Sequence, residues 1–457
     1  MKTSRRFPQP KPRTLALALP AALLLALLLY LLPPVRQRVD FHLDDWRTRL
    51  KYALDPPEKV VFLPQGSNLG DPAARETMAA VVSATLGALP PTRTPAPSPA
   101  PAGEVVEASP TPAPSPTATA TLLPLPAQAY VEGVRYEDQH GLWNYCGPAN
   151  LSMALSFWDW DGDRLDAGKW LKPYDRDKNV MPYEMAEFVN TQTEGLQAAV
   201  RVGGTLRLLK TLLAEGFPVL VEKGSYLRDT TGVTSWMGHY QVVTGYDDEQ
   251  GVFIAQDSYL QPDLEVPYDE FERGWRAFNF TYVLIYSPDK EEQLRGLLGP
   301  DWDEAANYRR AYEQSSHESI ALSGLDRLFA QFNRGTNMVA LQDYMGAAEA
   351  YDEYYRQYAS LDIPENERPW RMLWYQTGPY RAYLYAGNPY AVIELATITL
   401  ERMVNEPTLE ESFYWRGMAK AAAGDTAGAV QDFREALQWH PGWGLAQQQL
   451  SLLGAEP

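Results

Sequence analysis

Cys146 is the only cysteine in the 457-residue sequence, and it lies in the segment LWNYCGPANLSMALSFW. A single cysteine cannot form an internal disulfide, so it is either a small buried apolar residue or a group that reacts. Pro148 is typical of a first helical turn, and helical spacing relates the apolar residues that follow, Leu151, Ala154, Leu155 and Trp158. The thiol is therefore expected at a helix N-terminus, where backbone N–H groups and the helix dipole favour a thiolate.

A cysteine nucleophile also needs a base, a group that orients the base, and donors for an oxyanion. Gly147 is expected to leave room for a substrate backbone. The sequence has five histidines: His42, His140, His239, His317 and His440. Only His140 and His239 lie in the compact segment around the cysteine. His140 is expected to be a loop residue, which leaves His239 as the candidate base.

A predicted β-hairpin brings an acid to this histidine. His239 opens the segment HYQVVTGYD, and Asp257 closes the next apolar run, GVFIAQDSY, with the turn DDEQG between them. Folding this hairpin places residue 239 opposite residues 257 to 258. Whether both side chains point to one face depends on parity, which a bulge at Gly251 would settle. A carboxylate beside an imidazole fixes its tautomer and stabilises the imidazolium.

The blocks NYCGPANLSMAL, GHYQVVTGYD and FIAQDSY together resemble the double-glycine (bacteriocin-leader) peptidase-like family of papain-fold cysteine peptidases. The resemblance covers about residues 130 to 287. It implies that Cys146 is the nucleophile, His239 the general base and acid, and Asp257 the orienting residue. Papain-like enzymes also place a glutamine in the oxyanion hole, usually six residues before the cysteine. Gln139 lies seven residues before it and is the candidate here, beside the Cys146 backbone N–H.

Each of these residues could also have a purely structural role. Cys146 could be a buried structural thiol, His239 an ordinary strand residue and Asp257 a turn acid. The acidic segment DWDGDRLD does not fit a calcium-binding loop, because its glycine is at the fourth position and not the sixth. No cofactor or metal site is predicted.

The N-terminal region predicts a membrane anchor. Residues 1–13 are basic, and residues 14–33 contain the apolar run LALALPAALLLALLLYLL, long enough for one transmembrane helix. The excess of positive charge before this run predicts a cytoplasmic N-terminus and an extracytoplasmic body. A cleaved signal peptide is the alternative, but PPVRQR follows where a cleavage site of small residues would be needed.

Composition divides the rest of the chain. Residues 34–89 form a mixed juxtamembrane region, and residues 90–126 form a proline-, threonine- and alanine-rich linker that cannot bury a core. Residues 127–288 are expected to form an α+β domain of papain-like fold, because predicted helices come first and predicted strands follow.

Residues 289–457 are predicted to form an all-α domain of tetratricopeptide-like repeats. The unit that begins near Leu409 has Gly417, Ala429, Phe433, Ala436 and Pro441 at that family's positions. Two weaker units cover about residues 328 to 361 and 373 to 406, with start-to-start spacings of 45 and 37 residues. A generic helical bundle is the alternative.

A net charge of −18 excludes a nucleic-acid-binding function. The leading hypothesis is a membrane-anchored cysteine peptidase or amide hydrolase that acts on a peptide or protein substrate. An acyl transferase would use the same residues. The rival hypothesis is an inactive peptidase-like domain whose helical repeats bind a protein partner at the cell surface.

Overall fold

The computed structural model describes residues 24, 26–63, 124–174, 176–228, 232–406 and 408–457. Most of the predicted membrane helix (14–33) and of the predicted linker (90–126) lies outside these ranges. Within the described ranges, no helix combines the length and the apolar character that crossing a bilayer requires.

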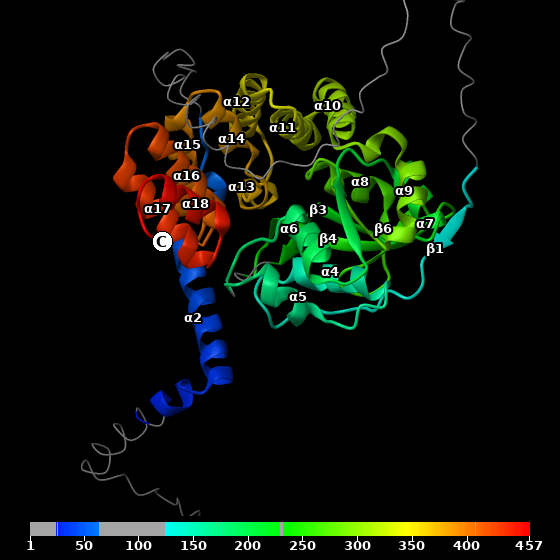
Figure 1. The fold of residues 1–457 in the computed structure, drawn as a ribbon, viewed down its shortest axis with the longest axis horizontal. Coiled ribbons are helices and arrows are strands. Elements are labelled where there is room, and N and C mark those ends of the chain that lie inside the picture. The colour runs from blue at the N-terminus through cyan, green and yellow to red at the C-terminus, as the bar shows by residue number, and fades with distance from the viewer. Residues whose placement is uncertain (1–23, 25, 64–123, 175, 229–231, 407) are drawn as a thin grey trace, which may run out of the picture.

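One antiparallel sheet organises the first half of the described chain (Figure 1). Its strand order is β2-β7-β3-β4-β5-β6, and β1 pairs with the C-terminal part of β4. The strands are β1 (Gln128–Tyr130), β2 (Gln197–Arg201), β3 (Val219–Arg228), β4 (Thr234–Asp247), β5 (Val252–Gln256), β6 (Leu264–Pro267) and β7 (Tyr282–Tyr286). We call residues 127–298, which hold this sheet and its helices, the sheet domain.

Helices cover both faces of the sheet because neighbouring strand residues point to opposite sides. Leu220 packs with α4 (Cys146–Ser156), α5 (Arg164–Leu171) and α6 (Pro182–Gln192). Its neighbours Val219 and Val221 pack with α7 (Leu206–Ala214), α8 (Tyr268–Arg276) and α9 (Glu291–Leu298). The sheet domain therefore has two apolar cores, and the helix that begins at Cys146 lies in the first.

Residues 304–457 form a helical domain (Figure 1). Its longer helices are α10 (Glu304–Ala321), α11 (Gly324–Ala340), α12 (Tyr344–Ser360), α14 (Gly378–Tyr385), α15 (Pro389–Ile398), α16 (Glu410–Ala422), α17 (Thr426–Trp439) and α18 (Gly444–Leu452). The short helix α13 (Met372–Tyr375) precedes α14, and a π-helical turn η5 (Thr399–Met403) follows α15.

Three helix pairs in this domain are joined by the same kind of turn. The side chains of Asp343, Asn388 and Asp425 cap α12, α15 and α17 by accepting the backbone N–H three residues later. The residue before each cap has a positive φ. The caps are 45 and 37 residues apart, which are the spacings of the predicted repeats.

The first helix of two pairs also carries a glycine at the helix contact. A Cβ on Gly335 would lie 2.8 Å from Tyr351, and a Cβ on Gly417 would lie 2.9 Å from Phe433. Close approach of the two helices in each pair therefore depends on glycine at these positions.

The segment before the linker packs on the helical domain. Figure 1 shows helix α2 (Pro33–Leu54) running outward from that domain. Lys51 donates to the carbonyl of Glu401, and Asp55 pairs with Arg402 at 2.7 Å. Phe62 is buried against the ring of Tyr355. The C-terminal end of α2 and the residues after it are thus part of the folded body.

The two domains share an apolar core. Trp236 and Phe278 of the sheet domain stack on each other, and Trp236 also stacks on Phe329 of the helical domain. Arg371 lies beside them and donates to the Trp236 carbonyl at 2.8 Å. The helical domain therefore packs directly on β4, the strand that carries His239.

Candidate active site

The cysteine lies in a cavity of about 330 Å³ at the junction of the two domains. Cys146 is the first residue of α4 and is partly buried. The structure brings the four predicted site residues to this place, since Gln139, Cys146 and His239 line the cavity and Asp257 bonds to His239. The predicted position of the thiol at a helix N-terminus agrees with the structure.

Buried polar contacts hold the loop that leads to the cysteine. Lys172 is 4% exposed and donates to the carbonyls of Trp143, Asn144 and Asp177. Asn144 has a φ of 45° and donates through its side chain to the Asp177 carbonyl at 3.1 Å. These bonds fix the backbone entry into α4, and with it the position of the sulfur.

The expected role of Gly147 was wrong. A Cβ at this position would lie 2.9 Å from the Cβ of Val180 and 3.1 Å from Met185. The space beside Gly147 is filled by the protein's own core, and the residue is buried. Glycine is needed here so that α4 can pack against residues 180–185, and it leaves no room for a substrate backbone.

A β-bulge puts the histidine and the acid on one face. Gly245 pairs with Ile254 and Val243 pairs with Ala255, so Thr244 is an extra residue in β4. The bulge is at Thr244 and not at Gly251. Val242 pairs with Gln256, so one residue further along Asp257 lies opposite Gln241 and diagonal to His239. The prediction had placed His239 directly opposite residues 257 to 258, an error of about two residues.

Asp257 binds both of these side chains. Nε2 of His239 donates to its Oδ1 at 2.9 Å, and Nε2 of Gln241 donates to its Oδ2 at 2.6 Å. The backbone N–H groups of Tyr259 and Leu260 also donate to Oδ1. The carboxylate is thus held by four donors, and it holds the imidazole by one ring nitrogen.

Charge stabilises the protonated imidazole in this setting. Burial lowers the pKa of His239, but the negative charge of Asp257 and hydrogen bonds to Asp257 and Cys146 outweigh it and raise the pKa to about 10. Burial alone would raise the pKa of Asp257. The positive charge of His239 and the hydrogen bonds from His239 and Gln241 outweigh burial and bring this pKa below its ordinary value. Because Nε2 is bound to Asp257, Nδ1 is the nitrogen that faces Cys146.

A second network fixes the side chain of Gln139. Its Oε1 accepts from the Ser258 hydroxyl at 2.7 Å, and its backbone N–H donates to the Ser258 carbonyl at 2.8 Å. Asn150 donates to Ser258 Oγ at 2.8 Å and to the Cys146 carbonyl at 2.9 Å. With Oε1 bound in this way, the N–H groups of Gln139 Nε2 are the ones left to face the cavity.

The cavity wall comes from widely separated parts of the chain. Residues of α2 (Asp44, Thr48 and Tyr52), of the helical domain (Arg371, Trp374, Tyr375, Asn405 and Glu406) and of β3 (Glu222) all line it. Glu222 is 6% exposed, and burial together with the nearby Cys146 charge holds its pKa well above the ordinary value, against a hydrogen bond from Tyr240 that lowers it.

Two other groups singled out in the sequence take no part in the hydrogen bonds described above. His140 is at the rim, exposed, with its Nδ1 on Asp138 at 2.6 Å. In the segment DWDGDRLD, Asp163 caps α5 and Asp166 completes the capping box. These carboxylates therefore have a local structural role.

Comparisons with known proteins bear on the same region. Residues 131–283, which contain all four site residues, match the model of the Peptidase_C39 like family. This part of the sheet domain is therefore similar to the domain that defines that family. A solved structure described as a C39-like peptidase from Bacillus anthracis is 15% identical, covers 35% of this chain and 98% of that chain, and has a TM-score of 0.29. That likeness adds no argument about the site. No match was found among curated proteins.

Sequence reasoning did not identify several residues that position the candidate site. Asn150 lies one helical turn after Cys146, Ser258 follows Asp257, and Gln241 lies two residues after His239. The spacing of Asn150 and Gln241 from the predicted site residues, one helical turn and two strand residues, was the available signal. Glu222 and the helical-domain residues of the wall had no such signal, because only the tertiary fold brings them there.

Proposed function

We propose that this chain is a cysteine peptidase or amide hydrolase with Cys146 as nucleophile, His239 as general base and acid, and Asp257 as the residue that orients His239. The arrangement of these three groups at one cavity is the observation that carries the proposal. The C39-like match supports a peptide or protein substrate.

The reaction follows from the positions of the groups. The Cys146 thiolate attacks an amide carbonyl, and the oxygen that becomes negative is stabilised by the Cys146 backbone N–H and by Gln139 Nε2. His239 passes its proton to the leaving amine. Water, deprotonated by the same imidazole, then hydrolyses the thioester and releases the acid.

The helical domain and α2 take part in substrate selection in this proposal. Both contribute to the wall of the cavity that contains Cys146. The cavity volume, about 330 Å³, is at the small end of the ~300–1,000 Å³ range of ligand pockets, so it admits a few residues of an extended peptide and no folded chain. If the helical domain is a stack of tetratricopeptide-like repeats, it also offers a candidate binding surface for a protein partner.

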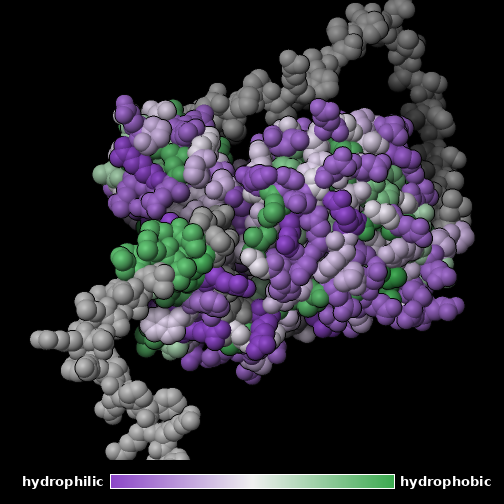
Figure 2. All heavy atoms as spheres, turned by 90° about the horizontal axis from the view of Figure 1, so that it is seen from below, coloured by the Kyte–Doolittle hydropathy of each residue, from purple (hydrophilic) through white to green (hydrophobic). Residues whose placement is uncertain are grey.

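We also propose that the N-terminal segment anchors the protein in a membrane, with the N-terminus cytoplasmic and the body outside. The described part of that segment supports the proposal, because leucines 24, 27, 28, 29, 31 and 32 are exposed ahead of α2. Figure 2 shows hydrophobic residues gathered on the surface close to the point where the grey N-terminal atoms begin.

The decisive experiment compares the full chain with its Cys146→Ala variant on a peptide library, with a thiol-directed probe in parallel. We expect cleavage and fast labelling by iodoacetamide in the wild type, and neither in the variant. Labelling no faster than that of a free thiol, together with no cleaved peptide, would contradict the proposal. Adding an amine acceptor distinguishes hydrolysis from acyl transfer by product mass.

The scaffold alternative predicts a different result. A protein partner would then be retained by residues 290–457 and would bind the Cys146→Ala variant as well as the wild type. Binding that requires the helical domain, in a chain with no cleavage activity, would favour that role.

A further inference from the structure

A second cluster of titratable side chains lies where the two domains meet, and none of its three members lines the Cys146 cavity. Glu184 is on α6 of the sheet domain, Glu410 begins α16, and His440 follows α17. One ligand atom from each of these three residues lies within 4.8 Å of the other two. The cluster therefore combines two carboxylates and an imidazole from both domains.

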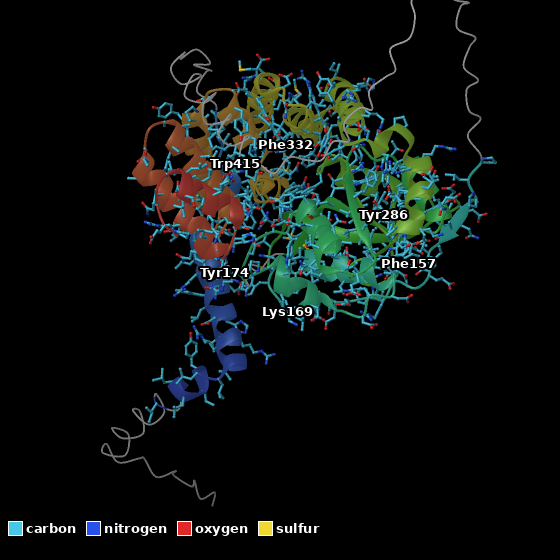
Figure 3. The ribbon with its side chains drawn as sticks, viewed as in Figure 1. Phe157, Lys169, Tyr174, Tyr286, Phe332 and Trp415 are labelled. Atoms are coloured by element: carbon cyan, nitrogen blue, oxygen red, sulfur yellow. The ribbon has the colours of Figure 1, made fainter. Side chains whose placement is uncertain are left out.

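The neighbouring packing shows that this is an interior junction. Tyr174, labelled in Figure 3, packs edge-on against Trp439, with ring centroids 4.9 Å apart. Arg176 pairs with Glu406 at 3.0 Å. Trp439 directly precedes His440, so the contact that joins the domains also positions the imidazole.

Glu410 is the residue that points to a ligand. It is 3% exposed, and its Oε1 lies 3.4 Å from His440 Nδ1. Its Oε2 is buried and accepts no hydrogen bond from any described residue. A buried carboxylate oxygen without a donor is costly, and a cation would satisfy it.

We propose that Glu184, Glu410 and His440 bind a divalent transition-metal ion, with Zn²⁺ as the best match, and that this ion joins the helical domain to the C39-like domain. A mixed set of carboxylate and imidazole ligands suits Zn²⁺, whereas Ca²⁺ and Mg²⁺ prefer oxygen ligands alone. Tetrahedral Zn²⁺ sets its ligand atoms about 3.4 Å apart, so binding draws the three side chains together by about 1 Å. Water completes the coordination.

The test must exclude binding at the catalytic thiol, because a cysteine beside a histidine also binds Zn²⁺. The titration is therefore done on the full-length Cys146→Ala protein, by calorimetry and by metal analysis after dialysis. We expect one equivalent of Zn²⁺, and an apparent Tm that rises by roughly 5 °C at a hundredfold excess over Kd. Ca²⁺ and Mg²⁺ should give no comparable shift.

Ligand variants decide between this site and non-specific binding. In the same background, Glu410→Gln and His440→Asn should each weaken Zn²⁺ binding at least tenfold. Glu187→Gln, an exposed acid on the same helix as Glu184, and His317→Asn, an exposed histidine on α10, are the controls and should leave binding unchanged.

His440→Asn keeps the experiment decisive if Glu410→Gln does not fold, because the His440 side chain is 23% exposed and tolerates exchange better. No Zn²⁺ bound to Cys146→Ala, or binding unchanged by His440→Asn, would overturn the proposal. Neither result depends on catalysis, so loss of this site and failure of the proposed peptidase function are distinguishable.

Discussion

Asp257 accepts a hydrogen bond from Nε2 of His239 at 2.9 Å, and neither side chain is more than 1% exposed. The bond fixes the ring so that Nδ1 faces Cys146. A buried carboxylate in this position also stabilises the positive imidazole that the proposed reaction needs.

Asp257→Asn should reduce kcat by about 10³- to 10⁴-fold, because an amide at this position neither carries the charge nor fixes the tautomer. The variant should still fold, since an amide oxygen can accept the same backbone bonds. Steady-state cleavage of a peptide found by library screening is the measurement. Asp289→Asn, an exposed acid outside the cavity, is the control. A loss below tenfold would show that Asp257 does not orient the base.

The pH dependence of stability tests the same pair. The pKa of His239 is about 10 in the folded chain and ~6.5 when unfolded. The folded state therefore keeps a proton that the unfolded state releases. The stability that comes from this is complete below pH ~6.5, declines as pH rises, and is lost above about pH 10. The lowered pKa of Asp257 contributes stability above ~3.8 that is lost as pH falls.

The apparent Tm of the wild type should thus fall between pH 7 and 10, and that of Asp257→Asn should fall less. Other titrating groups affect both proteins alike, so the difference between the two curves isolates the pair. Parallel curves would mean that His239 is not held protonated by Asp257.

Gln139 provides the next prediction. Gln139→Ala should lower kcat by roughly 10²- to 10³-fold with little change in KM, since the amide acts on charge that develops in the transition state. Ser258→Ala should have a smaller effect in the same direction, because it frees the amide to rotate without removing it. If Gln139→Ala lowers kcat and raises KM by the same factor, Gln139 has a substrate-binding role instead.

Glu222 should lower the free energy of unfolding at neutral pH. Its pKa is held well above the ordinary value by burial and by the Cys146 charge. The unfolded chain ionises freely above pH ~4.5, so the folded state is disfavoured progressively as pH rises from there. Glu222→Gln should therefore raise the apparent Tm by a few degrees at pH 7, and the gain should shrink toward pH 4.5. Glu215→Gln, an exposed acid that ends α7, should show no gain.

Much of this site follows from local sequence pattern. A helix starting at the sole cysteine and a hairpin joining His239 to Asp257 were predicted, and the structure has both. The two predicted strands of this hairpin correspond to β4 and β5, each with shifted ends. These elements have strong apolar periodicity and clear turn residues, which are the signals that sequence carries best.

The features that could not be predicted from the sequence depend on the tertiary structure. The bulge at Thr244 has no marker in VVTGYD, yet it decides which face Asp257 shares with His239. The short strand β2 and the helix α6 are weakly patterned. The helical domain was expected to be a separate module, and nothing in its sequence indicates that Arg371 and Trp374 line the cavity of a cysteine more than two hundred residues earlier.

Arg371 connects this wall to the strand that carries His239, the proposed base. It is 4% exposed, and its guanidinium donates to Ser235 Oγ at 2.7 Å and to the Trp236 carbonyl at 2.8 Å. It also lies over the ring of Trp370, 3.9 Å from the centroid. Because His239 is only three residues beyond Trp236 in β4, the guanidinium holds the helical domain against the strand that carries His239.

Arg371→Leu should therefore disturb the wall of the cavity, and with it substrate binding, more than the rate of reaction at Cys146. Loss of the two donors leaves buried acceptors unsatisfied, at a cost of about 2–4 kcal/mol in the free energy of unfolding. KM for a peptide substrate should rise by at least tenfold while kcat changes less, since substrate is positioned by the wall and reacts at Cys146. Arg381→Leu, which removes an exposed arginine from α14, is the matched control. If Arg371→Leu lowers kcat and leaves KM unchanged, the helical domain acts on the geometry of His239 and not on the binding of substrate.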